Sequence, residues 1–238
     1  MKRKNLIAKT KIHKNLLKHL VKRNYKNIYS KFEIFLNESK VNSFVVAVSG
    51  GVDSLALVFL AKCYQLKNSS KIFFVHIDHS LRQSSSEEAD FLNKNLKRFD
   101  IDCKIIKWKK SKKIQGSQAN ARKFRYKSLQ KFCKTNKIEH ILLAHHIDDF
   151  HENFFIRMIR GSGLRGLVSF SDSKSTSNEG ITYLRPFLGY SKKILSKITN
   201  TIFGFNINDP SNQNPKYLRT RVRTVSYTHL RAHETKSY

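Results

Sequence analysis

The sequence predicts an α/β fold, in which helices cover both faces of a doubly wound, mostly parallel sheet and a small helical extension follows near the C-terminus. Short, continuous apolar runs alternate with segments of helical character at a spacing of roughly 10–15 residues, which is typical of βαβ units. The first apolar run ends at a glycine pair in the stretch SGGVDS (49–54). In such folds, the turn from the first strand to the first helix follows directly after a buried strand, as this glycine pair does.

Four strands and four helices are predicted in strict alternation after residue 43. The predicted strands are residues 44–49, 71–79, 101–109 and 138–145, and the predicted helices are residues 55–67, 84–99, 118–136 and 148–161. Serines and early acidic residues open the second of these helices, and Gly161 ends the fourth. The apolar stretch FFIRMI (154–159) recurs at helical spacing, so we expect it to pack in the core.

The alternation weakens beyond Gly166. Residues 171–180 (SDSKSTSNEG) have the composition of a loop, and residues 181–199 predict a short strand or turn followed by a helix. The last residues, 225–238, have no periodicity. We expect them to form a disordered or non-native tail without a function of its own.

The first 31 residues are a basic segment. They contain eleven Lys or Arg and no acidic residue, and their apolar residues recur at a spacing that predicts an amphipathic helix. Packing of this helix on the domain is the simplest interpretation. An arm that contacts RNA and an organellar transit peptide both stay open, although Arg and Ser are scarce for a transit peptide.

Composition limits the classes of protein to consider. The formal net charge of +29 predicts attraction to a polyanion, either nucleic acid or an anionic membrane surface, although a Lys-rich proteome would account for part of it. Cys63, Cys103 and Cys133 are far apart, which argues against a disulfide scaffold, a zinc ribbon or a cysteine-held iron–sulfur cluster and favours the cytoplasm. No run of about 18 apolar residues and no signal-peptide pattern is present, so we expect no membrane span.

SGGVDS lies where open α/β sheets bind ligands, beyond the carboxyl end of the first strand. Gly50 and Gly51 would allow positive φ angles and a close approach of backbone N–H groups to an anion, and the following helix directs its positive end to the same place. Ser49 and Ser54 add hydroxyl donors. A plain glycine turn is the simpler alternative, but this stretch is more specific, and it fits neither the Walker A nor the GxGxxG pattern.

SGGVDS resembles the pyrophosphate loop of the PP-loop ATP pyrophosphatases, which have a Rossmann-like fold of the adenine nucleotide alpha hydrolase type. Further stretches occur in the order and spacing of one branch, the tRNA(Ile)-lysidine synthetases. They are VHIDHSLR (75–82), QANARKFRY (118–126), AHHIDDFHENFFIRMIRGSGLRGL (144–167), RPF (185–187) and DPSNQNPKYLRTRVR (209–223). The resemblance covers residues 44–223.

The resemblance implies a ligase that joins free L-lysine to C2 of the wobble cytidine in tRNA(Ile) with a CAU anticodon. ATP would adenylate the cytidine and release pyrophosphate, and the lysine ε-amine would then displace AMP to leave lysidine. ATP is thus the implied co-substrate, and Mg²⁺, held by Asp53, is the implied metal. A tRNA partner suits the basic chain. No membrane partner is implied, and a homodimer stays open.

The resemblance also gives expected roles to domains and residues. The expected domains are a basic N-terminal arm or helix (1–40), a PP-loop ATP-binding catalytic domain (41–170), an extension that binds substrate and tRNA (171–225) and the tail (226–238). The expected catalytic residues are Asp53, His145, Asp148, Asp149 and Glu152. The expected ATP-binding residues are Ser49, Gly50, Gly51, Val52, Asp53, Ser54, His76, Asp78 and Arg122. The expected tRNA-binding residues are Arg125, Arg160, Arg165, Arg185, Arg219, Arg221 and Arg223.

Three acids can be weighed without the resemblance. Asp148 and Asp149 lie four and three residues before Glu152, so all three meet at the start of one predicted helix. Such carboxylates could hold Mg²⁺, bind the lysine ammonium, or take the proton that the amine must lose. An acidic first turn that complements the helix dipole is the alternative. For each arginine the alternative is an ordinary solvated surface charge.

Histidine spacing predicts no zinc site. His145, His146 and His151 lack the spacing that places two ligands on one helical face. We therefore expect His145 near the adenylated base. For His76 and Asp78, polar residues that emerge at a strand end are the simpler alternative.

Three positions depart from the family pattern. Phe150 stands where a Gln is expected, Gln118 where a Glu is expected, and Thr220 where an Asn is expected. These departures put in doubt the contacts of those side chains but not the chemistry of the loop. Three other functions stay open: a tRNA cytidine thiolase of the same superfamily, a small-molecule PP-loop synthetase, and an RNA-binding protein with a decayed nucleotide fold.

Overall fold

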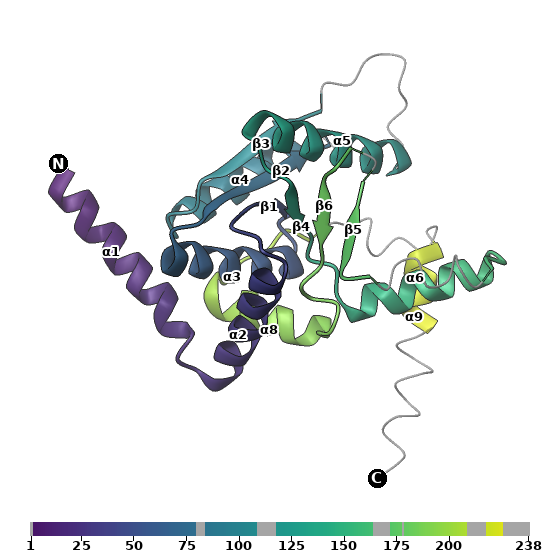
Figure 1. Cartoon of the computed structure of the whole chain (residues 1–238), viewed down its shortest axis with the longest axis horizontal. Coiled ribbons are helices and arrows are strands. Elements are labelled where there is room, and N and C mark those ends of the chain that lie inside the picture. The colour runs from purple at the N-terminus through teal and green to yellow at the C-terminus, as the bar shows by residue number, and fades with distance from the viewer. Residues whose placement is uncertain are drawn as a thin grey trace, which may run out of the picture.

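The computed structural model describes residues 2–79, 84–108, 118–163, 172–177, 179–208 and 218–225, and only the backbone at residues 2–6, 118–119 and 223–225 (Figure 1). Its strands are β1 (Ser43–Val48), β2 (Lys71–Asp78), β3 (Cys103–Lys107), β4 (His140–Leu142), β5 (Lys174–Thr176) and β6 (Thr182–Leu184). Its helices are α1 (Lys2–His19), α2 (Arg23–Glu38), α3 (Val52–Asn68), α4 (Ser85–Lys97), α5 (Gln118–Asn136), α6 (Ile147–Ile159), α8 (Lys192–Ile202) and α9 (Leu218–Val225). None of the helices in these ranges is long and apolar enough to cross a membrane.

The strands form one sheet in the order β3-β2-β1-β4-β6-β5. All neighbours are parallel except β5, which pairs antiparallel with β6. The predicted mostly parallel sheet is confirmed, and β1 lies in its interior between β2 and β4. Strand β5 was not predicted, because its polar residues KST lie inside the stretch that we expected to be a loop.

Each face of the sheet has its own core, because successive side chains of a strand point to opposite faces. Phe44, Val46 and Val48 of β1 face a core shared with α2, α3, α4 and α8, whereas Val45 faces a second core beneath α5. Figure 1 shows these helices on the two sides of the sheet. The predicted doubly wound arrangement is therefore confirmed. The carboxyl end of β1 therefore lies between the two layers of helices.

The basic N-terminal segment folds as two helices rather than the single helix that we expected. Residues 20–22 form a turn between α1 and α2. Helix α2 buries Tyr25, Ile28, Tyr29, Phe32 and Leu36, so it belongs to the main core. Leu16 of α1 is buried in the same core, so both helices pack on the domain.

Helix α6 corrects a second expectation. Residues 154–159 do not lie in the core: Glu152 is the buried residue of α6, and Met158 and Ile159 are half exposed or more. The helix projects beyond the sheet and packs against α9 (Figure 1). Helical spacing identified the helix correctly, but it could not tell whether other elements cover the apolar side.

Candidate active site

The loop between β1 and α3 has the shape predicted for an anion cradle. Gly50 has a φ of +86°, which side chains rarely allow. A Cβ atom there would lie 2.6 Å from Cδ1 of Ile207, whose N–H donates to the Gly50 carbonyl over 2.9 Å. Glycine is therefore required at residue 50 by both conformation and space. Helix α3 begins at Val52, and the N–H groups of its first turn have no partner within the helix.

Gly51 differs from the prediction. Its φ is −72° and its ψ is 163°, an extended conformation open to any residue. The nearest atom to a Cβ there is Oγ of Ser49 at 3.6 Å, an ordinary contact. Backbone conformation thus explains the glycine at residue 50 but not at residue 51. At residue 51, the lack of a side chain leaves the backbone N–H groups open to a ligand.

The two serines of the loop brace it internally. The Ser54 hydroxyl donates to the Gly51 carbonyl over 2.9 Å, and it lies 3.2 Å from the Ser49 amide and 3.0 Å from the Ser49 hydroxyl. Ser54 is buried, and its single proton is already used inside the loop. That Ser54 donates to a ligand stays a prediction, since in this structure its proton is directed to the Gly51 carbonyl. Val52 is braced in the same way, because Oγ1 of Thr199 in α8 donates to its carbonyl over 2.6 Å.

His146 connects the loop to the acids of α6. Its Nε2 atom lies 3.6 Å from Oδ2 of Asp53 and 3.5 Å from Oδ2 of Asp149, and its Nδ1 atom lies 3.5 Å from Oδ2 of Asp148. The ring is buried, with 2% of its surface exposed. This role of His146 was not predicted from the sequence. Its place directly before an acidic helix start, the N-cap position, was the available signal that it lies close to those acids.

Electrostatics favours the protonated form of His146. Burial acts to lower its pKa, but the hydrogen bond to Asp53 and the charges of Asp149, Asp53 and Asp148 outweigh this and raise the pKa above its ordinary value. The cluster thus pairs one buried cation with three carboxylates. One oxygen of Asp53, Oδ1, is buried and has no hydrogen-bond partner among the described residues.

The three predicted acids of α6 make different contacts. Asp148 accepts from the N–H of Lys192, the first residue of α8, over 2.8 Å. Asp149 accepts from the His146 N–H over 3.2 Å, which caps α6. Burial raises the pKa of Asp149, although the charges of His146 and Arg219 oppose this. Asp149 thus caps the helix, as the helix-dipole alternative expects. That alternative does not account for His146, which lies near Asp53, Asp148 and Asp149.

Glu152 and Asp149 hold a cation in this structure. Nε of Arg219, from α9, donates to Oε2 of Glu152 over 2.9 Å, and an Nη atom of Arg219 lies 3.5 Å from Oδ1 of Asp149. Glu152 is 4% exposed, whereas the Arg219 side chain is 46% exposed. Arg219 was predicted to contact tRNA, but its guanidinium is occupied by these two carboxylates.

His145 lies among cations rather than acids. Burial lowers its pKa to about 3, and the charges of Arg185, Arg125, Arg122 and Arg219 act in the same direction. The imidazole is therefore neutral at physiological pH. The adjacent residues His145 and His146 thus have pKa values shifted in opposite directions, because one lies among arginines and the other among carboxylates.

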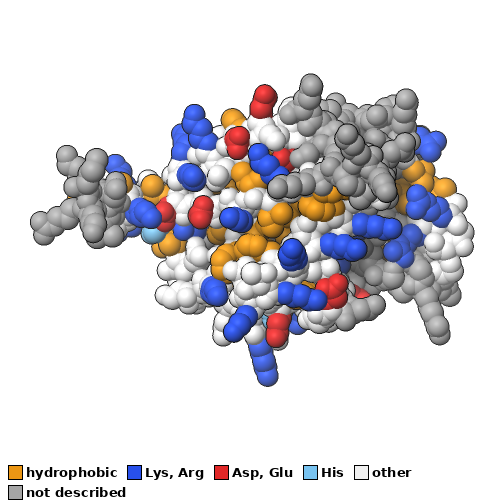
Figure 2. All heavy atoms as spheres, turned by 90° about the horizontal axis from the view of Figure 1, so that it is seen from above, with side chains coloured by type: hydrophobic (Ala, Val, Ile, Leu, Met, Phe, Trp, Pro, Cys, Tyr) orange, Lys and Arg blue, Asp and Glu red, His pale blue; other side chains and the backbone are white. Residues whose placement is uncertain are grey.

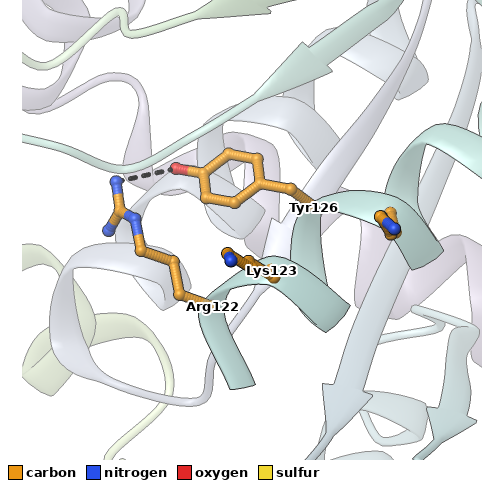
Figure 3. A pocket seen from close by; sticks show the side chains of 4 residues that line it. Arg122, Lys123 and Tyr126 are labelled. Carbon is orange, nitrogen blue, oxygen red and sulfur yellow. Dashed lines mark hydrogen bonds between the residues drawn. The ribbon is translucent and has the colours of Figure 1, made fainter. Parts of the chain in front are cut away.

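Helix α5 supplies part of that positive environment. Figure 3 shows Arg122 donating to the Tyr126 hydroxyl, at 3.4 Å, in a pocket of about 480 Å³ whose lining also includes Lys123 and Lys127. The guanidinium carbons of Arg122 and Arg125 lie 5.2 and 5.6 Å from the Tyr126 ring centroid. Burial lowers the pKa of Arg125, and its buried Nε has no hydrogen-bond partner among the described residues. A concave cationic surface of this kind suits a phosphate.

The remaining predicted residues are less central. His76 donates through Nδ1 to the Val48 carbonyl over 2.9 Å, and burial lowers its pKa. Asp78 is buried and accepts from the Ser86 hydroxyl over 3.2 Å. Arg185 donates to the Asp172 carbonyl and the Ser175 hydroxyl. Asp78 is buried, so the simpler interpretation, a strand end whose polar residues emerge into solvent, does not describe it, and the expected role of His76 and Asp78 at the nucleotide stays a prediction.

Some predicted residues are exposed or lie outside the described part of the chain. Arg160 and Arg221 are exposed at the ends of α6 and α9. Arg165 lies outside the described residues, and only the backbone is described at Arg223 and Gln118. Phe150 packs edge to face against His151 and near Phe154, so the departure at residue 150 adds an apolar contact within α6.

The three cysteines are buried and unpaired. Cys63 and Cys103 lie in one core and Cys133 in the other, across the sheet. Burial raises the pKa of each thiol to about 12. Among the described residues, no three His, Cys, Asp or Glu side chains form a metal-binding group.

Curated relatives agree in name. Proteins called tRNA(Ile)-lysidine synthase from Orientia tsutsugamushi, from the Wolbachia of Brugia malayi and from Rhodopseudomonas palustris are 40%, 38% and 33% identical to this chain. The matches cover 76%, 77% and 81% of the chain but 40%, 43% and 56% of the relatives. The chain therefore spans about half the length of the curated relatives that it matches.

Solved structures show the same fold. U34-tRNA thiolase NcsA from Methanococcus maripaludis, solved with its 4Fe–4S cluster, has a TM-score of 0.71 at 15% identity, over 88% of this chain and 74% of its own. NMN synthetase from Francisella tularensis has a TM-score of 0.51 at 11% identity, over 91% and 96%. At such identities the likeness concerns the fold alone. The family model for the PP-loop domain matches residues 19–230, and the chain therefore belongs to the PP-loop domain family.

Proposed function

We propose that this protein uses ATP to join L-lysine to C2 of the wobble cytidine in tRNA(Ile) with a CAU anticodon. The observation that carries the proposal is the connection through His146. It links Asp53 of the phosphate loop, at 3.6 Å, to Asp149 of the acidic helix start, at 3.5 Å. The loop that would bind the ATP phosphates and the carboxylates that would bind the lysine amine thus belong to one cluster of side chains. The curated relatives of the same name support this assignment.

The proposed reaction has two balanced steps. The cytidine O2 atom attacks the α-phosphorus of ATP, the bond to the β-phosphate breaks, and pyrophosphate leaves. The lysine ε-amine then attacks C2 and expels AMP with its oxygen, and the amine loses a proton to a nearby base. The loop N–H groups and the start of α3 would hold the departing pyrophosphate. His145 is neutral, so it can hydrogen-bond the base without adding charge.

Asp53 is the proposed Mg²⁺ ligand. Its buried, unpartnered Oδ1 atom fits a hard cation, which takes oxygen ligands. Mg²⁺ usually keeps several waters and phosphate oxygens and needs only one or two carboxylates, so a larger protein cage is not required. When bound, the ion would neutralise charge on the phosphates.

Asp149 and Glu152 are the proposed lysine site. The same carboxylates hold the Arg219 guanidinium in this structure, which supports their ability to bind an organic cation at this place. The lysine amine must be neutral when it attacks, and Asp149, whose pKa burial raises, is the proposed proton acceptor. Lysine would displace Arg219 or share the site with it.

Other proposals concern the remaining partners. Arg125, Arg160, Arg185 and Arg221 are the proposed phosphate contacts for tRNA, with Arg122 at the ATP phosphates. The chain would act in the cytoplasm, which suits three unpaired thiols. The domain limits given above, with 41–170 as the catalytic domain, are proposed because, like the residue roles, they follow from the resemblance to the family. A homodimer would contain two such sites.

A tRNA cytidine thiolase is the second candidate, because a thiolase shares the fold. The cysteines of this chain disfavour it. Cys133 lies across the sheet from Cys63 and Cys103, and burial raises the pKa of each thiol to about 12, so the three cannot jointly hold a cluster or act readily as thiolates.

The decisive experiment is mass analysis of the wobble nucleoside after the chain is incubated with unmodified CAU tRNA, ATP and L-lysine. Lysidine, AMP and pyrophosphate are the expected products. Release of ADP and phosphate, or formation of a thiolated cytidine, would refute the proposal.

Asp53→Asn tests the role of the loop. This variant should abolish formation of AMP and pyrophosphate, because a neutral amide is a poor Mg²⁺ ligand, while tRNA affinity stays near the wild-type value. Ser69→Ala, at an exposed helix end, serves as the control and should keep full activity. AMP formation by Asp53→Asn together with lost tRNA binding would contradict the assigned role.

A further inference from the structure

Helix α1 is docked on the domain by one of its faces. Leu16, and Leu20 directly after the helix, are buried against the core, and His13 and Lys9, one and two turns before Leu16, contact the same aspartate. These four residues lie within a narrow arc of the helix, because successive residues are 100° apart. The orientation of α1 about its own axis is therefore fixed.

Asp100 is the polar anchor of this contact. It has a φ of +55°, and its carboxylate lies 2.9 Å from Nζ of Lys9 and 2.8 Å from Nε2 of His13. The buried Lys62 of α3 donates to the Asp100 carbonyl over 2.6 Å. Although burial opposes ionisation, Lys9, His13 and Lys62 hold the pKa of Asp100 at about 2. The anchor therefore stays charged at physiological pH.

The opposite face of α1 is a stripe of lysines. Lys11, Lys14 and Lys18 are exposed and spaced i, i+3 and i+7, which places them about 140–160° around the helix axis from Leu16. Docking of the inner face therefore presents these three cations together to solvent. The family match begins at residue 19, so the stripe precedes the conserved domain model.

The charge pattern of α1 is unfavourable for a helix that only meets water. No acidic residue occurs in the first 32 residues, so α1 has no acidic side chain in its first turn and no internal ion pairs. Like charges three and four residues apart destabilise a helix, by about 0.2–0.5 kcal/mol per pair. A polyanion removes this repulsion and gains from the regular spacing of the cations.

We propose that the outer face of α1, formed by Lys11, Lys14 and Lys18, binds the phosphate backbone of the tRNA substrate. The inference rests on the proposed function for the identity of the RNA. In Figure 1, α1 and the α6–α9 pair lie at opposite ends of the molecule, so the stripe would hold a part of the tRNA remote from the reacting base.

An anionic membrane is the less suitable partner for this face. A helix that lies on a membrane needs an apolar side to insert among the lipids. The apolar side of α1 is already packed on the domain through Leu16 and Leu20. Ile7 is the one described apolar residue of the lysine face that is strongly exposed, at 68%.

The test compares two charge-matched triple variants of the whole chain. The first combines Lys11→Gln, Lys14→Gln and Lys18→Gln. The control combines Lys94→Gln, Lys104→Gln and Lys131→Gln, three exposed lysines on α4, β3 and α5. Binding of unmodified CAU tRNA is measured as a function of salt, and circular dichroism checks that helix content is retained.

We expect the α1 variant to bind tRNA roughly tenfold more weakly or worse, with a salt slope flatter by about two to three units. The control should keep the wild-type slope, and replacement of the same three residues by Arg should restore binding. An unchanged slope for the α1 variant, or equal losses in the control, would overturn the proposal. So would a loss of binding to phosphatidylserine vesicles with unchanged tRNA affinity. Because the readout is binding, inactivity of the wild-type chain would count only against the proposed function.

Discussion

At the scale of single residues, Gly50 and Gly51 have separate reasons to be glycine. Only Gly50 has a positive φ, and only there would a Cβ atom meet a neighbour, Ile207, at 2.6 Å. Gly51 caps α3 in an extended conformation. The pair is a single motif in the sequence, but the two positions contribute differently to folding.

Gly50→Ala should therefore destabilise the protein by about 2 kcal/mol or more, from backbone strain and overpacking together. Gly51→Ala should change the free energy of unfolding by only about 0.5 kcal/mol. Denaturant unfolding of both variants checks this pair of expectations. Equal losses at both positions would show that the loop conformation, and not residue 50, sets the requirement.

His145 predicts a specific dependence of stability on pH. Its folded-state pKa is about 3, below the value of about 6.5 expected in an unfolded chain. As the pH falls from 6.5 towards 3, the unfolded chain binds a proton at this residue that the folded chain does not. The folded state is thereby disfavoured at low pH. His146, with a raised pKa, contributes stability below pH 6.5 that is lost as the pH rises through its folded-state pKa.

Wild-type protein should therefore lose more unfolding free energy between pH 7 and 5 than His145→Gln does. The difference between the two proteins is the quantity to measure, since other titrating groups are common to both. NMR should find the His145 ring still neutral at pH 5. A ring that titrates near 6.5 would rule out the cationic, buried environment described for it.

At the scale of elements, α6 and α9 meet through one cluster of charges. Arg219 of α9 joins Asp149 and Glu152 of α6. Because the Arg219 side chain is half exposed, solvent weakens the pair, and its loss should cost less than that of a fully buried one. The pair thus positions α9 without fixing it strongly.

Glu152→Gln should raise the KM for lysine roughly tenfold or more, because a charged hydrogen bond to the ammonium is lost. The KM for ATP should stay unchanged. Steady-state kinetics with each substrate varied in turn makes the comparison. A parallel rise in the KM for ATP would place Glu152 in the nucleotide site instead.

The sequence predicted elements whose signal is local. Strand β1, its glycine turn and the start of α6 follow from apolar runs and acidic caps, and they occur as expected. What failed depends on tertiary neighbours. Strand β5 is polar and exists because β6 pairs with it. None of the described elements buries FFIRMI, and His146 became central because three separate carboxylates converge on it.

At the scale of the whole molecule, charge is the dominant feature. The chain has a formal net charge of +29, and Figure 2 shows Lys and Arg side chains spread over the face in view, with few acidic ones among them. The acids of the site are thus a local negative patch on a positive body. This arrangement attracts a polyanion broadly, and the proposed lysine site lies within the negative patch.

The KM for tRNA should accordingly rise steeply with salt, by about a thousandfold between 50 and 200 mM if six phosphates are contacted. The KM for ATP and lysine should change far less, because few charges are involved in each. Initial rates of AMP formation at several salt concentrations test this. A flat KM for tRNA would mean that the basic surface does not contact the substrate.

The contact between Ile207 and Gly50 has a consequence for how the molecule is made. The loop leaves the ribosome early, but the residue that packs against it and bonds its carbonyl is synthesised more than 150 positions later. A nascent chain would form β1 and α3 first, yet hold the loop in its final shape only once residue 207 has emerged. Nucleotide binding would therefore wait until residue 207 has been synthesised, and chains shorter than that would not sequester ATP.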